Sequence, residues 1–198
     1  MTTDTVFLRA VSGTVDLPLL PLPDRVAALL SVLGVPPRLA AHLRAVHDVA
    51  HQLIDWVAER YPSVAIDREA ALFGAATHDI GKTVHLAELS GPGAAHEETG
   101  RALLLERGVS QELARFAATH ASWTRSDVVL EDLLVSLADK IWKNKRVPDL
   151  EDLVVARLAE ATGRPEWEEF LALDEILSRI GDEADARLAF QASFPIHT

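Results

Sequence analysis

Apolar residues recur every three or four positions along most of the chain, from about residue 24 onward. This spacing places them on one face of an α-helix, so it predicts a succession of amphipathic helices. Asp24 is a candidate N-cap for the first helix, and Tyr61 and Pro62 end the longest one. The predicted helices cover residues 24–34, 38–60, 67–81, 94–108, 110–123, 130–145, 149–163 and 165–181, with a last helix ending near residue 193. We therefore expect an all-α bundle of roughly seven to nine helices.

The N-terminal residues show a different pattern. The segments VFLRAV and TVDLPLL flank Ser12 and Gly13, which is typical of a short hairpin or an extended arm. Several prolines then interrupt the chain before the helical pattern begins. We expect an extended arm over residues 1–23, a helical domain over 24–146, and C-terminal helices over 147–198 packed on the same domain.

The amino-acid composition excludes several classes of protein. The 198 residues are 48% hydrophobic and 25% charged, which suits one globular domain with its own core. The absence of cysteine excludes disulfides, thiolate catalysis and cysteine-ligated metal sites. A formal net charge of −11 argues against binding of duplex nucleic acid and against adsorption to an anionic membrane. No segment has the apolar length of a transmembrane helix and the first residues lack a secretory pattern, so we expect a cytoplasmic protein.

The basic residues are unevenly distributed. The chain has eight histidines but only four lysines, and three of those lysines belong to the run DKIWKNKR. Lys140, Lys143 and Lys145 form either a solvated helix face or a cationic rim beside an otherwise acidic site. The helices from Asp149 to Asp185 are acidic, and they could form the face of a homodimer or a lid.

Imidazole and carboxylate side chains fall on five successive predicted helices. They are His42 and His47 on the longest helix, His78 and Asp79 at the end of the next, and then His96, His120 and Asp139. Asp139 lies in an apolar stretch, where an unpaired buried charge is costly, so it needs a partner or a metal. These side chains suit Fe, Mn, Zn, Ni or Co ions. We expect His51, His85 and His197 to be ordinary surface or core-edge residues.

The same side chains could hold two ions, because the two oxygens of Asp79 could bridge them. One ion would be held by His42, His78, Asp79 and Asp139, and the other by Asp79, His96 and His120. Two divalent ions roughly 3.5–4 Å apart can clamp a phosphoryl group and generate hydroxide at neutral pH. The pattern therefore predicts two divalent transition-metal ions that act on a small phosphorylated molecule.

The ordered pattern His…His-Asp…His…His…Asp resembles the HD-domain superfamily of metal-dependent phosphohydrolases. The run THDIGK at 77–82 matches its signature, HEETGRALLLERG at 96–108 resembles its His-x-x-x-Gly helix, and LADKIWKNKR at 137–146 resembles its final Asp helix. The resemblance covers about residues 38–146. It implies a helical bundle around a metal site and hydrolysis of a nucleotide or other small phosphate ester by hydroxide generated at the metals.

The first metal ligand has two candidates. In the family, the first histidine is followed by small apolar residues four and eight positions later. His42 is followed by apolar residues at both places, whereas His47 is followed by a histidine and an aspartate, so helical geometry favours His42. The separation from His78 slightly favours His47. We take His42 as the prediction.

The resemblance also implies a role for Lys82. The corresponding lysine of the family's HDxxK motif points toward the substrate phosphate, where an ammonium would offset developing negative charge. The alternative is a helix-end lysine that faces water. Asp79 and Lys82 are therefore the candidate catalytic residues.

Two other functions would use the same residues. Some HD-fold proteins, similar to myo-inositol oxygenase and the phosphonate-cleaving enzymes, hold a mixed-valence di-iron pair and oxidise a small organic substrate. The six ligands alone cannot separate this oxygenase hypothesis from hydrolysis. A catalytically degenerate domain that senses a nucleotide would be expected to lack a ligand, but all six positions are filled.

Overall fold

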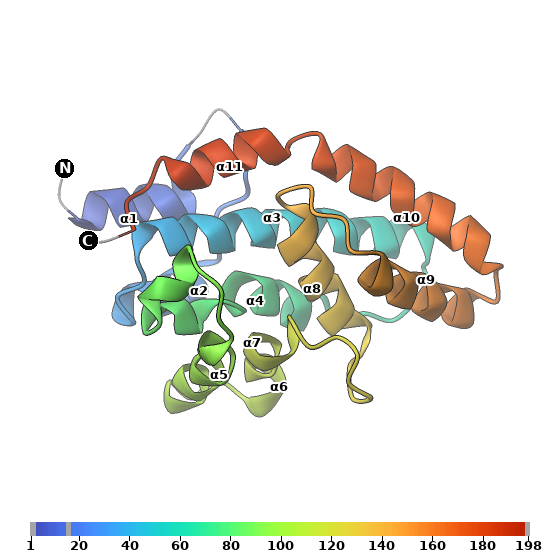
Figure 1. Ribbon diagram of the computed structural model, residues 1–198, viewed down its shortest axis with the longest axis horizontal. Helices are drawn as coiled ribbons and strands as arrows, with labels where there is room; N and C mark the ends of the chain where they lie inside the picture. The colour runs from blue at the N-terminus through green and yellow to red at the C-terminus, as the bar shows by residue number, and fades with distance from the viewer. Residues whose placement is uncertain (1–2, 15–16, 197–198) are drawn as a thin grey trace.

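The structure is a computed structural model that describes residues 3–14 and 17–196, and within these ranges it contains helices and no strand. The predicted all-α fold class is confirmed (Figure 1). The elements are α1 (Thr3–Ser12), α2 (Asp24–Val32), α3 (Pro37–Arg60), α4 (Arg68–Thr77), η1 (Ile80–Thr83), η2 (Leu86–Leu89), α5 (Ala95–Glu106), α6 (Gln111–Ala114), α7 (Phe116–Thr119), α8 (Leu130–Ile141), α9 (Pro148–Thr162), α10 (Glu166–Gly181) and α11 (Ala184–Ala192), where η marks a 3₁₀ helix. None of these helices is long and apolar enough to cross a membrane.

The N-terminal segment differs from the prediction of a hairpin or extended arm, because its first part is helix α1. Phe7, Ala10 and Val11 follow helical spacing, and they join a hydrophobic cluster that includes residues of α3. A strand here would have no partner strand among the described residues, whereas a helix pairs its own backbone groups. Residues 17–23 form neither helix nor strand, so only this part is arm-like.

Two of the predicted helices are shortened or divided by turns in the structure. The helix predicted over residues 67–81 ends at Thr77, and the one predicted over 110–123 is divided into α6 and α7. Asp24 is not the N-cap of α2, since Pro23 occupies that position and Asp24 lies in the first turn. A carboxylate in the first turn still favours the helix through its dipole.

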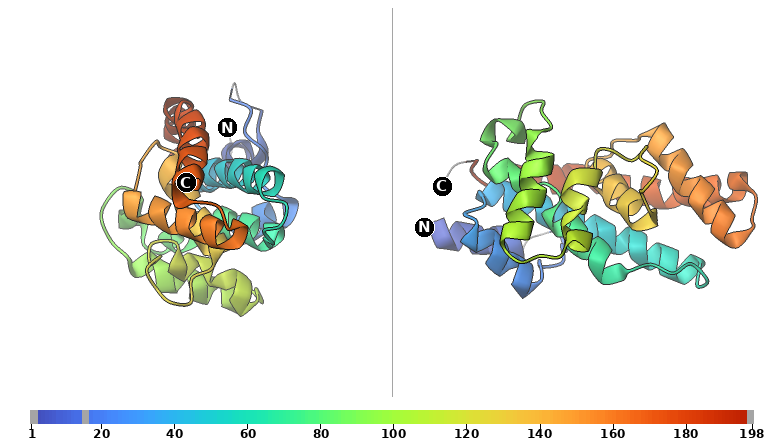
Figure 2. Two further views of the ribbon diagram at one scale, coloured as in Figure 1. Left: turned by 90° about the vertical axis from the view of Figure 1, so that its right-hand side faces the viewer. Right: turned by 90° about the horizontal axis from the view of Figure 1, so that it is seen from below.

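Helix α3 is the centre of the bundle (Figures 1 and 2). Helices α4 and α8 pack against it, and so do α1 and α11 from the two ends of the chain. Its apolar side chains, such as Leu43, Val46, Leu53 and Val57, are buried at helical intervals. Full burial of one such side chain contributes about 1.5–3 kcal/mol to the free energy of folding. Helix α3 is therefore held firmly in the bundle and can position the functional groups that it carries.

The C-terminal helices pack on the same bundle. Helices α9 and α10 form an antiparallel pair that extends to one end of the molecule (Figure 2). Gly163 ends α9 in the left-handed conformation, with a φ of 71°. The buried guanidinium of Arg187 in α11 donates to the carbonyl oxygens of Ile180 and Trp142, the latter at 2.8 Å. This contact ties α11 to the end of α8.

Arg44 of α3 provides a first test of the fold. Its buried guanidinium donates hydrogen bonds to the carbonyl oxygens of Gly13, Leu19 and Leu20, at 2.7–2.9 Å. Arg44→Met would leave these carbonyls without their donor, so we expect a loss of about 3 kcal/mol in the free energy of unfolding. Urea denaturation measures this loss, and Arg107→Met at an exposed site is the control. Equal stability of the two variants would contradict this role for Arg44.

Candidate metal centre

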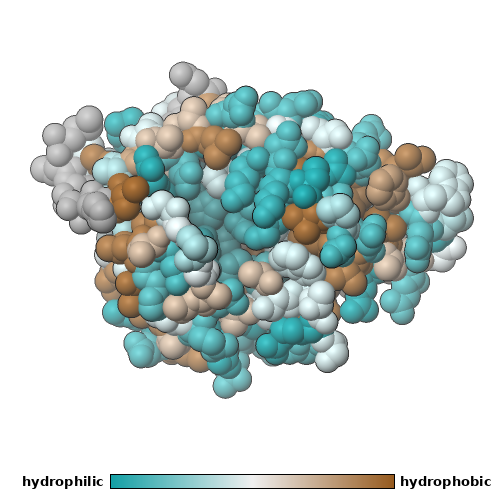
Figure 3. All heavy atoms as spheres, in the orientation of Figure 1, coloured by the Kyte–Doolittle hydropathy of each residue, from teal (hydrophilic) through white to brown (hydrophobic). Residues whose placement is uncertain are grey.

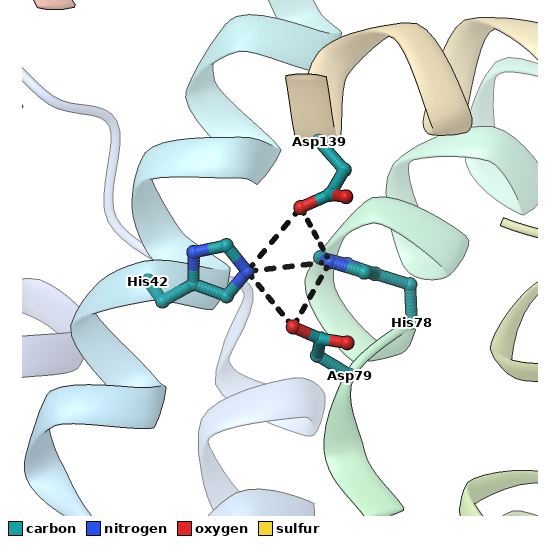
Figure 4. A group of neighbouring side chains, drawn as sticks. All are labelled: His42, His78, Asp79 and Asp139. Atoms are coloured by element: carbon teal, nitrogen blue, oxygen red, sulfur yellow. Dashed lines mark hydrogen bonds and ion pairs between the residues drawn. The ribbon is translucent and has the colours of Figure 1, made fainter. Parts of the chain in front are cut away.

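Four buried side chains from three helices meet at one point beside α3. His42 comes from α3, His78 and Asp79 from the end of α4, and Asp139 from α8, and Figure 4 shows all four side chains pointing toward one another. His42 Nε2 lies 3.3 Å from His78 Nε2 and 3.1 Å from Asp79 Oδ2. His78 Nε2 lies 3.4 Å from Asp139 Oδ1. One ligand atom from each residue fits within 4.8 Å of the others, close enough to surround a single ion.

A second buried cluster shares Asp79 with the first. Asp79 Oδ1 lies 3.2 Å from His96 Nε2 and 3.4 Å from His120 Nε2. The two imidazole nitrogens are 3.5 Å apart. The other oxygen of Asp79 faces His42, so the carboxylate lies between the two clusters. This is the arrangement that a bridging aspartate would need.

The chain turn after α4 explains how two adjacent residues face the same site. The helix ends at Thr77, and Asp79 then takes φ −99° and ψ 10°, outside regular helix, before η1 begins. Gly81 lets η1 approach α5 closely, because a Cβ there would lie 2.0 Å from the carbonyl oxygen of His96. A side chain at position 81 would therefore push Asp79 away from His96.

The hydrogen bonds of the imidazoles fit a cation at the centre of each cluster. His78 Nδ1 lies 2.9 Å from the carbonyl oxygen of Ala75, and His120 Nδ1 lies 3.0 Å from that of Ala117. A carbonyl only accepts, so Nδ1 of each ring carries a hydrogen, and with a cation bound Nε2 would turn its lone pair toward that cation. Asp79 Oδ1 is buried and receives no hydrogen bond. Asp79 Oδ1 is thus an acceptor between the clusters that a divalent cation would satisfy.

The charges of the site keep both carboxylates ionised. Burial would raise the pKa of Asp79, but four neighbouring imidazoles outweigh burial and hold that pKa well below its ordinary value. Burial acts in the same way on Asp139, whose pKa is lowered by His78 and by Lys140. Lys82 Nζ lies 2.5 Å from Asp79 Oδ2, and Lys140 Nζ lies 2.6 Å from Asp139 Oδ2. Ionised carboxylates are the form that binds metal.

Glu88 of η2 is a residue of the site that the sequence analysis missed. Its Oε2 lies 2.5 Å from His96 Nδ1, and its carboxylate also accepts the backbone N–H groups of Ala95 and His96. Because a carboxylate only accepts, Nδ1 of His96 holds a hydrogen, which leaves Nε2, the nitrogen that faces Asp79, as the atom that would bind a metal. Gly93 makes room, since a Cβ there would lie 2.3 Å from Glu88 Oε1. The Gly-Pro-Gly loop before His96 was the available signal, but it does not point to an acidic residue upstream.

Glu88→Gln tests this role without removing a metal ligand. The amide oxygen can still accept the backbone N–H groups, but it lacks the negative charge that orients and strengthens the imidazole. Second-shell losses of this kind typically lower metal affinity 10–100-fold, so we expect a loss of about that size at the His96 cluster. Calorimetric titration of the metal-free protein with Zn²⁺ measures this loss, and Glu98→Gln, at an exposed position in the first turn of α5, is the control. Unchanged Zn²⁺ affinity in both variants would contradict the role of Glu88.

The structure brings the six predicted ligands together and leaves the other histidines apart. His47, the alternative first ligand, lies outside both clusters, and its ring packs edge-on against His51 with centroids 4.9 Å apart. His85 Nε2 lies 2.9 Å from the hydroxyl oxygen of Thr99. His197 lies outside the described residues.

A cavity of about 450 Å³ opens onto the two clusters. All four lysines of the chain line it: Lys82, Lys140, Lys143 and Lys145. The run DKIWKNKR is thus a cationic rim at this cavity, and hydrophilic residues gather over the middle of the corresponding face in Figure 3. The buried ring of Trp142 packs edge-on against His42, with centroids 4.9 Å apart. The lysines are therefore gathered at one cavity, where they face the carboxylates of Asp79, Glu88, Glu97 and Asp139.

Comparison with known proteins agrees with this geometry. The family model of the HD domain matches residues 39–143, which is more than half of the chain and includes all six clustered side chains. No curated protein and no solved structure gave a significant match. The matched range, the all-α fold and the buried His/Asp clusters together show that the chain belongs to the HD-domain family.

Proposed function

We propose that this protein hydrolyses a nucleotide or another small phosphate ester with the help of two divalent metal ions. The observation that carries the proposal is the position of the two clusters, which share Asp79 and face a cavity lined by every lysine of the chain. Ammonium groups attract and neutralise phosphate oxygens, whereas a neutral organic substrate would gain nothing from them. The lysine rim therefore favours a phosphorylated substrate.

The side chains divide into metal ligands and groups that act on the substrate. His42, His78, Asp79 and Asp139 would hold one ion, and Asp79, His96 and His120 would hold the other. When bound, such ions supply hydroxide at neutral pH and Lewis acidity toward a phosphoryl group. Lys82 and the lysines of α8 and its following turn would hold the phosphate oxygens and offset charge as the ester bond breaks. No protein nucleophile is required.

The two competing hypotheses have less support from the cavity. An HD-type di-iron oxygenase could use the same six ligands; four lysines disfavour a neutral substrate such as a polyol for it, although they would also suit a phosphonate. A degenerate nucleotide-sensing domain is disfavoured because each cluster retains all of its side chains. Hydrolysis of a phosphate ester uses both the clusters and the lysines, and metal analysis distinguishes it from oxidation of a phosphonate.

The direct test combines metal analysis with a phosphate-release screen. Protein purified without chelator is analysed for metals by plasma mass spectrometry, and then incubated with nucleotides and small phosphate esters. We expect two transition-metal ions per chain and phosphate release that stops when a chelator removes them. Iron content with an EPR signal and oxygen consumption, and no phosphate release, would instead support the oxygenase.

A substitution at Lys82 should lower the rate of the reaction without changing the metal content. The Lys82 ammonium contacts Asp79 Oδ2 and cannot itself be a ligand, so Lys82→Met should retain full metal content. Loss of one contact that stabilises the transition state costs on the order of 10²-fold, and we expect that decrease in kcat/KM for the best phosphate ester. Lys82→Arg keeps the positive charge and should recover part of the rate. Full activity of Lys82→Met would make Lys82 an ordinary solvated lysine.

A further inference from the structure

A second cavity, of about 480 Å³, lies between α2, α3 and α4. Its lining is Pro23, Arg25, Val26, His47, His51, Arg68, Glu69, Leu72 and Phe73, none of which lines the cavity at the metal clusters. His51 follows His42 on α3 by nine residues, which is half a turn around the helix axis. The second cavity therefore lies on the opposite side of α3 from the metal clusters.

His47 is a buried polar side chain without a partner in this cavity. Its exposed fraction is 2%, and neither ring nitrogen makes a hydrogen bond. Burial, followed by the neighbouring His51 and Arg68, lowers the pKa of His47 to about 3, so the ring is neutral. A neutral imidazole offers one donor and one acceptor, and buried groups of this kind are nearly always paired. None of the residues that the structure describes supplies this pairing.

Two further groups offer hydrogen-bond donors at the same cavity. Arg68 Nη2 lies 2.9 Å from His51 Nδ1, and because a guanidinium only donates, the neutral His51 ring carries its hydrogen on Nε2. The guanidinium of Arg25 stacks 5.0 Å from the ring centroid of Phe73, and none of the described carboxylates pairs with it. Arg68, in contrast, is already paired with Asp55 at 2.5 Å. The cavity thus presents an unpaired cation and a free imidazole N–H.

The remaining wall consists of the apolar residues Pro23, Val26, Leu72 and Phe73, with the exposed Glu69 as its one carboxylate. Charged donors next to an apolar wall suit a molecule that has an anionic group and an apolar body. We propose that this cavity binds a small organic carboxylate, which accepts hydrogen bonds from Arg25 and His51 and packs its apolar part on Phe73 and Leu72. The site is independent of the metal clusters and of the reaction proposed for them.

The experiment uses the full-length protein with ¹⁵N-labelled histidine, and benzoate as the probe. Long-range ¹H–¹⁵N spectra follow the ring nitrogens of His47 and His51 during the titration. We expect both rings to shift on addition of benzoate. Acetate lacks the apolar body and benzyl alcohol lacks the charge, so each should bind at least about tenfold more weakly.

Variants assign the probe to this cavity. Arg25→Gln should raise the Kd for benzoate about tenfold, since it removes the unpaired cation from an exposed position that does not threaten the fold. Arg107→Gln, also exposed but outside the cavity, should leave the Kd unchanged, and so should Asp79→Asn at the metal clusters. Histidine signals that do not move up to the solubility limit of benzoate would show that the cavity holds water only. Equal affinity in Arg25→Gln, or loss of the shifts in Asp79→Asn, would also overturn the proposal.

Discussion

Asp79→Asn is expected to empty both metal clusters at once and to reduce phosphate release to background. Asp79 faces His42 with one carboxylate oxygen and His96 and His120 with the other, so no other described side chain takes part in both clusters. Asparagine keeps the size of the side chain but removes its charge, which leaves four imidazoles and Asp139 to hold two cations. Second-shell changes alone cost 10–100-fold in metal affinity, so loss of a shared ligand should exceed about 100-fold.

The control for this prediction is a second buried aspartate that is not part of the clusters. Asp132 of α8 is 1% exposed and accepts hydrogen bonds from Thr119 and Arg115. Asp132→Asn should lower the midpoint of thermal unfolding but keep metal content at the wild-type level. Plasma mass spectrometry after dialysis compares the two variants. If Asp79→Asn retains two ions per chain, the bridging role is wrong.

The helices could be predicted from the sequence because their signal is local. Apolar residues of α3 fall at i, i+3 and i+4 intervals over several turns, and only one face of a helix can satisfy that spacing. The N-terminal residues carry the same signal over a shorter length, where Phe7, Ala10 and Val11 are too few to outweigh their strand-like composition. What decides α1 is its packing on α3, and this tertiary contact is not visible in the segment itself.

The six clustered side chains could also be predicted, because they fall on five successive predicted helices in a fixed order, with His78 and Asp79 adjacent on one of them. The residues that pair with these six side chains could not be predicted from the sequence. Lys82 and Lys140 pair with the clustered carboxylates through contacts that depend on where each helix ends. Glu88 reaches His96 only because the loop through Gly93 folds back on η2. Contacts made by short, irregular segments have no periodicity that a sequence pattern can reveal.

His42→Ala and His47→Ala provide the sharpest comparison between sequence and structure. Both side chains are buried on α3, five residues apart, and either could begin the family pattern. His42 Nε2 lies within 3.6 Å of His78 Nε2, Asp79 Oδ2 and Asp139 Oδ1, whereas His47 belongs to neither cluster. His42→Ala is therefore expected to lose the ion of the first cluster, with a fall of more than about 100-fold in its affinity.

His47→Ala serves as the matched variant, since it removes the same side chain from the same helix. It should lose stability through the void that it opens in the bundle, but its metal content should equal that of the wild-type protein. Calorimetric titration of both metal-free variants with Zn²⁺ measures the two affinities under one condition. A loss of metal in His47→Ala together with retention in His42→Ala would mean that α3 is rotated by more than a third of a turn from its position here. The second cluster, which neither side chain joins, should bind Zn²⁺ in both variants.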